Sequence, residues 1–141
     1  MGIPTEEQYG PTTELVRMHM MGCEMLCQEQ FQDLSLEKQK LYLAFELGVL
    51  EYHHRTMLTL DKSVDANNIF FEFLIFYSNY KYKHEQLRVF DFWRALAVES
   101  SMHEERELGF DSVNNYINSD GSRRQGHAPP VYFMKALRMK L

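Results

Sequence analysis

The chain has 141 residues and a mass of 16.8 kDa, so it corresponds to about one domain of the usual ~100–200 residues and excludes a fusion of two enzymes. Its hydrophobic residues (45%) and charged residues (25%) are typical of a globular chain and exclude a disordered or collagen-like one. The net charge of −5 divides unevenly: residues 1–120 carry ten Lys/Arg against twenty Asp/Glu (−10), and residues 121–141 carry five Lys/Arg and no acid (+5).

The first helix is predicted after an N-terminal arm. Residues 1–12 contain Pro4, Gly10 and Pro11 without a sustained period, and Thr12 or Thr13 is the expected helix cap. From residue 13 onward, apolar residues recur every three or four positions, as on one face of an amphipathic helix. These residues are Val16, Met20, Cys23, Cys27, Phe31 and Leu34.

A second helix is predicted over residues 36–60, with Ser35 as its N-cap. The third element, residues 69–77, has eight apolar residues in nine and is interrupted only by Glu72. Its aromatic content also suits a buried strand, and periodicity alone does not separate the two. We favour a helix because no partner strand is visible elsewhere.

A fourth helix is predicted over residues 85–107 and is expected to end at Gly109, with further turns over 111–118. Residues 119–130 resemble a basic surface loop, and residues 131–141 an amphipathic C-terminal helix. We therefore expect an all-α single-domain bundle: an arm (1–12), a core of four main helices (13–118), a flexible basic loop (119–130) and a short C-terminal helix (131–141).

Carboxylate and imidazole groups on two of these helices suggest one form of chemistry, a metal-dependent helical enzyme. In helical bundles, Glu-x-x-His pairs on facing helices can hold metal ions. The pattern here is incomplete, because the second Glu/His pair has a spacing of four. Salt-bridged helix faces are the competing explanation. The metal hypothesis rests on Glu51, His54, Glu72, Glu99, His103 and Glu107.

Other patterns point to structural roles. Glu72 in an apolar run requires a partner, either as a salt bridge at a helix rim or as an acid with a shifted pKa. Cys23 and Cys27 continue the apolar face of the first helix and are expected in the core, reduced as in the cytoplasm. No catalytic nucleophile motif or phosphate-binding loop is present, and no cofactor is expected.

Basic and aromatic residues alternate over residues 80–84, and Arg123, Arg124 and His127 follow in the expected loop. Such a mixture can stack bases and bind phosphates. The acidic body repels nucleic acid, so a helix junction and a solvated loop are the preferred interpretation.

The leading hypothesis is a non-enzymatic protein that binds another macromolecule as a regulator, adaptor or inhibitor. A protein partner is expected rather than nucleic acid, a homodimer remains open, and the C-terminal helix could instead fold back on its own core. One version is a decoy whose acids imitate a nucleic-acid backbone. The residues expected to bind the partner are Glu99, Glu104, Glu105, Glu107, Asp111, Arg123, Arg124, Lys135 and Arg138.

The sequence also bears on location. No apolar run reaches the ~18–20 residues of a membrane span. The first twenty residues contain Glu6, Glu7 and Glu14 and no apolar segment of a secretory signal. We therefore expect a cytoplasmic protein without membrane contact.

Overall fold

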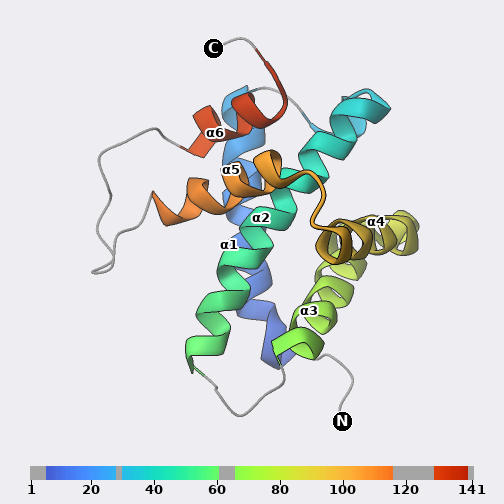
Figure 1. Cartoon of the computed structure of the whole chain (residues 1–141), viewed down its shortest axis with the longest axis vertical. Coiled ribbons are helices and arrows are strands. Elements are labelled where there is room, and N and C mark those ends of the chain that lie inside the picture. Colours follow the sequence, from blue (N-terminus) through green and yellow to red (C-terminus); the bar gives the residue numbers. More distant parts are fainter. Residues whose placement is uncertain (1–5, 28–29, 61–65, 116–128, 140–141) are drawn as a thin grey trace.

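The computed structural model describes residues 6–27, 30–60, 66–115 and 129–139. Within these ranges the chain is all-α, which confirms the expected class, and the third element is a helix rather than a strand (Figure 1). The elements are α1 (Glu6–Cys27), η1 (Phe31–Asp33), α2 (Leu36–Leu60), α3 (Ala66–Lys81), η2 (Lys83–Glu85), α4 (Gln86–Glu99), α5 (His103–Asn114) and α6 (Pro129–Ala136).

Helix α2 is the centre of the molecule. Every residue from Leu41 to Leu50 is buried, because the other five α-helices all contact α2. Its predicted start is confirmed: the Ser35 hydroxyl accepts a hydrogen bond from the Lys38 amide at 3.3 Å, which satisfies one of the free N–H groups of the first turn.

Helix α5 runs across α2 at a crossing that depends on two glycines (Figure 1). A Cβ atom on Gly48 would lie 1.9 Å from the Arg106 carbonyl oxygen, and one on Gly109 would lie 1.9 Å from the Phe45 carbonyl oxygen. The two backbones therefore touch where neither helix carries a side chain. Gly109 lies inside α5, so its predicted role as a helix terminator was wrong; it permits close packing instead.

The predicted single helix over 85–107 was also wrong, because the chain divides there into α4 and α5. Ser100 and Met102 adopt left-handed backbone conformations, with φ of 53° and 52°. The Ser101 amide donates to the Leu96 carbonyl at 3.1 Å and closes the end of α4. Left-handed positions usually hold glycine or asparagine, and neither residue occurs here, so this turn was not predictable from the local sequence.

The first helix begins earlier than predicted. Residues 6–12 were assigned to an arm, yet α1 starts at Glu6 and includes Pro11. Tyr9 explains the difference, because it is fully buried and its ring stacks on Phe73 at 5.9 Å between centroids. Burial of an aromatic side chain outweighs the hydrogen bond that Pro11 cannot donate.

The C-terminal helix folds back on the core. Phe133, Ala136 and Leu137 are buried, and α6 contacts α5, α1 and α2. Most of the predicted basic loop, residues 119–128, lies outside the described residues. None of the described helices is both long and apolar enough to span a membrane.

The glycine crossing gives a stability prediction. We expect Gly109→Ala to lower the free energy of unfolding by about 2 kcal/mol or more, because the added methyl group meets backbone rather than a side chain that could move. Gly22→Ala is the matched control: its Cβ would meet no atom within 4 Å, and alanine favours a helix. Urea denaturation measures both, and equal stability of Gly109→Ala and wild type would contradict the assigned role.

Candidate functional site

The most unusual polar group in the structure is the carboxylate of Glu46, which is fully buried at the centre of α2. The Tyr77 hydroxyl donates to Oε2 at 2.7 Å, and the Tyr82 hydroxyl donates to Oε1 at 2.6 Å. The Lys81 ammonium donates to Oε2 at 2.5 Å and to the Tyr42 hydroxyl at 2.8 Å. We call these five residues the Glu46 network.

The network keeps its phenols protonated. Burial, reinforced by the charge of Glu46, raises the pKa of Tyr77 and of Tyr82 well above the ordinary value. Both hydroxyls therefore remain donors. Lys81 balances the carboxylate charge, and its ammonium lies over the rings of Tyr42 and Tyr82 at 5.0 and 5.3 Å from the centroids. The buried charge is thus both neutralised and hydrogen-bonded.

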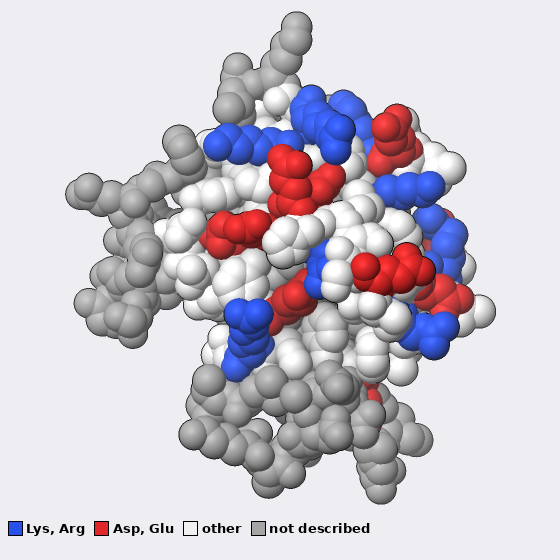
Figure 2. All heavy atoms as spheres, in the orientation of Figure 1, with Lys and Arg blue, Asp and Glu red and all other residues white. Residues whose placement is uncertain are grey.

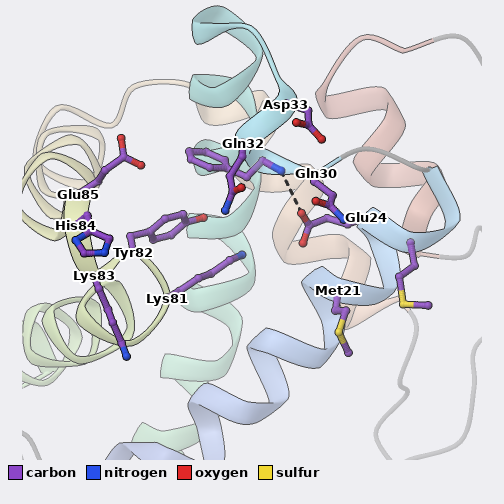
Figure 3. Close-up of a pocket in the computed structure, with 12 residues that line it drawn as sticks. Met21, Glu24, Gln30, Gln32, Asp33, Lys81, Tyr82, Lys83, His84 and Glu85 are labelled. Atoms are coloured by element: carbon purple, nitrogen blue, oxygen red, sulfur yellow. Dashed lines mark hydrogen bonds between the residues drawn. The ribbon is translucent and has the colours of Figure 1, made fainter.

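The Glu46 network adjoins a surface pocket of about 730 Å³, which Lys81 and Tyr82 line together with α1, η1 and η2 (Figure 3). On the α1 side, Met21 and Met25 provide apolar wall. Glu24 accepts a hydrogen bond from the Phe31 amide at 3.2 Å, which ties α1 to η1. Phe31 of η1 also lines the pocket, and the remaining wall is polar. Its residues lie in or next to η1 and η2: Gln30, Gln32, Asp33, Lys83, His84 and Glu85.

A row of apolar side chains on the outer face of α1 leads into this pocket. Leu15, Met18, Met21 and Met25 expose 55, 56, 42 and 69% of their surface. We call these four residues the α1 ridge. Flexible thioether side chains adapt to differently shaped protein surfaces, and an exposed apolar row is typical of a protein contact.

The residues of the metal hypothesis make separate contacts. Glu51 pairs with Arg106 at 2.9 Å, His103 with Glu107 at 3.5 Å, and Glu72 accepts from the Tyr9 hydroxyl at 2.8 Å. The His54 ring lies against Phe70, and Glu99 accepts from the Ser101 hydroxyl. Across the described ranges, no three His, Cys, Asp or Glu side chains converge as metal ligands.

A second pocket, of about 310 Å³, brings some of these residues close together. Glu51, His103, Glu107 and Asp111 line it beside Arg55 and Arg106. Burial raises the pKa of Asp111, and the charge of Glu107 adds to this. Arg55 lies over the Phe110 ring at 4.9 Å. Carboxylate and guanidinium groups therefore both line this pocket.

Four of the predicted partner-binding residues meet each other where α5 contacts α6 and the residues that follow it. Glu105 is buried and pairs with Arg138 at 3.2 Å, and Glu104 and Lys135 lie at the same small pocket. Glu99, Glu104 and Glu107 are exposed, whereas Arg123 and Arg124 lie outside the described residues. Figure 2 shows acidic and basic side chains interspersed on this face rather than one acidic surface.

The sequence interpretation missed Glu46. The signal was available, because Glu46 is the one charged residue in the run 41–50, just as Glu72 is in 69–77. Lys81 and Tyr82 had been grouped with a basic-aromatic junction, yet both turn inward toward Glu46. Cys23 is buried, as predicted.

The chain matches no protein-family model, no curated protein and no solved structure. What the chain does is therefore inferred from its own geometry.

Two partly buried histidines, His19 and His53, are expected to make the fold sensitive to acid. Burial lowers the pKa of His19 and of His53 from 6.5 to about 4, and the neighbouring His53 adds to the effect on His19. Ser112 donates its hydroxyl proton to the Gly109 carbonyl at 2.7 Å, so His19 Nε2, 2.8 Å from Ser112 Oγ, is the donor in their hydrogen bond. Both imidazoles are therefore neutral in the fold.

We expect the free energy of unfolding to be highest above pH 6.5 and to fall as the pH drops toward 4. The imidazoles of the unfolded chain take up protons in this window, whereas the two partly buried imidazoles of the folded chain stay neutral. Denaturation of wild type and His19→Gln across this range measures the effect, because glutamine can still donate to Ser112. The variant should show a shallower pH dependence, and identical slopes would contradict the role of His19.

Proposed function

We propose that this chain is a non-catalytic helical protein that works by binding another protein, as a regulator, adaptor or inhibitor. The observation that carries the proposal is the α1 ridge, whose four apolar side chains stay exposed although the opposite face of the same helix is buried. The hydrophobic effect favours removing such a row from water.

The pocket between α1, η1 and η2 supports the same proposal. Met21 and Met25 belong both to the α1 ridge and to the pocket wall, so one partner could cover the ridge and place a side chain in the pocket. An apolar row with a mixed polar rim is the usual composition of a protein interface. Lys83 and His84 are exposed on that rim and can make polar contacts.

The decoy version has less support than general protein binding, because Glu105 is paired with Arg138 and the exposed acids are interspersed with basic groups. The cytoplasmic location belongs to the proposal as well, and the buried thiol of Cys23 suits a reducing compartment.

Affinity capture with matched variants tests the proposal. We expect wild-type protein to retain a defined protein partner from the cells that make it, and Met21→Glu/Met25→Glu to lose most of it, because two buried charges oppose the contact. Val98→Glu is the control, since Val98 is 72% exposed on α4. Equal capture by the double variant and the control would contradict the proposed surface.

A further inference from the structure

One half-buried charge in the α1–η1–η2 pocket has no counter-ion among the described residues. Two other carboxylates at this pocket are paired: Glu46 with Lys81 at 2.5 Å, and Glu85 with Arg88 at 2.7 Å. Glu24 lines the pocket from α1 and is half-buried, yet no described residue forms a salt bridge with it. A carboxylate that is partly removed from water gains from a cation nearby.

Glu24 is held in place by neutral donors. It accepts a hydrogen bond from the Phe31 amide at 3.2 Å. Burial raises the pKa of Tyr42 well above its ordinary value, and the charges of Glu46 and Glu24 add to this, so Glu24 lies at the edge of the Glu46 network. Two carboxylates are therefore close to a single ammonium, that of Lys81. Since a carboxylate offers about four acceptor positions, Glu24 keeps acceptor capacity for a ligand.

The wall beside Glu24 suits a long side chain. Met21 and Met25 lie one helical turn apart on α1, line the pocket and are exposed. Figure 3 shows Glu24 extending from the same helix into the pocket. Lysine and arginine bury their methylene stems along apolar surface and keep the charged end at a polar group. Thioether side chains adapt to the shape of such a stem.

We propose that the protein partner inserts a lysine or arginine side chain into this pocket, with its stem along Met21 and Met25 and its charged end at Glu24. The inference rests on the proposed function and names the chemistry that the partner presents to the α1 ridge. An ammonium has three N–H donors and a guanidinium five. Side-chain oxygens of Gln32 and Asp33 line the same pocket and can accept the donors that Glu24 does not.

The basic residues of the pocket do not select an acidic side chain instead. The charge of Lys81 is already balanced by Glu46. Lys83 and His84 are exposed on the η2 side, where water and salt screen charge. Figure 3 shows them across the pocket from Glu24. An acidic side chain laid along the two methionines would therefore meet the unbalanced charge of Glu24.

Titration of the full chain with blocked amino acids tests this chemistry, read from NMR shifts of the Phe31 and Gln32 amides. The probes are the N-acetyl N-methylamides of lysine, norleucine and glutamate; norleucine has the four-carbon stem of lysine without its ammonium. We expect saturable shifts with lysine and about tenfold weaker binding, or less, of the other two. Equal binding of lysine and norleucine overturns the inference, as does glutamate binding as tightly as lysine or the absence of any shift with lysine.

A charge-removing variant tests Glu24 itself. Glu24→Gln should bind the lysine probe about tenfold more weakly, because the charge is lost while the side-chain oxygen can still accept from the Phe31 amide. Glu104→Gln is the matched control, since it makes the same charge change at an exposed residue of α5 outside this pocket. Circular dichroism checks that both fold, and the probe comparison on wild type decides the inference if Glu24→Gln does not. Equal affinity of the two variants overturns the role of Glu24.

The inference and the proposed function fail separately. Protein capture that depends on Met21 and Met25, without binding of the lysine probe, overturns the inference and leaves the proposed function standing. Binding of the lysine probe at Glu24, without capture of any protein, overturns the proposed function and leaves the preference of the pocket for a cationic group. Loss of capture in Glu24→Gln, together with binding of the lysine probe to wild type, supports both.

Discussion

The carboxylate of Glu46 has no access to water, and a buried carboxylate persists only when its charge is balanced and its oxygens are hydrogen-bonded. The groups that balance and hydrogen-bond this carboxylate lie far from Glu46 in the sequence. Tyr77 and Lys81 belong to α3, and Tyr82 lies between α3 and η2. Any arrangement of α3 that moved these donors would leave the charge unpaired. The Glu46 network therefore fixes the position of the end of α3, and with it the side of the α1–η1–η2 pocket that Lys81 and Tyr82 line.

The Glu46 network and the glycine crossing explain how the core is held together, but they do not involve the outer face of α1. Inward-facing polar groups serve the fold: Glu46 joins α2 to α3, and His19 joins α1 to α5 through Ser112. Gly48 and Gly109 hold α5 against α2, so the core closes tightly around α2. The outer face of α1 takes no part in these contacts. Its exposed apolar side chains are the feature that protein folding alone leaves unexplained, and we therefore assign function to them.

The sequence predicted the helices whose ends and patterns follow local rules. Ser35 is a side-chain cap, so α2 was predicted with its observed bounds, and the absence of any partner strand correctly favoured a helix over 69–77. The predictions were wrong where contacts between distant parts of the chain determine the local structure. Pro11 was interpreted as part of an arm because the burial of Tyr9 depends on α3, and Gly109 as a terminator because its contact partner, Phe45, is 64 positions earlier in the chain. The turn at Ser100–Met102 carries no glycine or proline.

The candidate site was harder to predict than the fold. Glu46 is recognisable in the sequence as a lone charge in an apolar run. The local sequence does not indicate that its partner is Lys81, 35 residues further along the chain. The exposed side of α1 was equally hidden, because Leu15, Met18, Met21 and Met25 lie beside or between the residues of the predicted apolar face and are as apolar as they are. Only packing of the opposite face shows which methionines remain outside. Apolar residues on a helix predict burial, and they do not say whether the buried contact lies within the chain or between chains.

A double-mutant cycle between Glu46 and Lys81, read from the free energy of unfolding in urea, tests the account most directly. We predict that Lys81→Met costs about 3 kcal/mol, because it leaves a fully buried carboxylate without its cation. Glu46→Gln should cost less, because Lys81 borders the pocket and can reach water. The double variant should lose less stability than the sum of the two. Strictly additive losses, or single variants as stable as wild type, would contradict the claim that the Glu46 network organises the fold and its pocket.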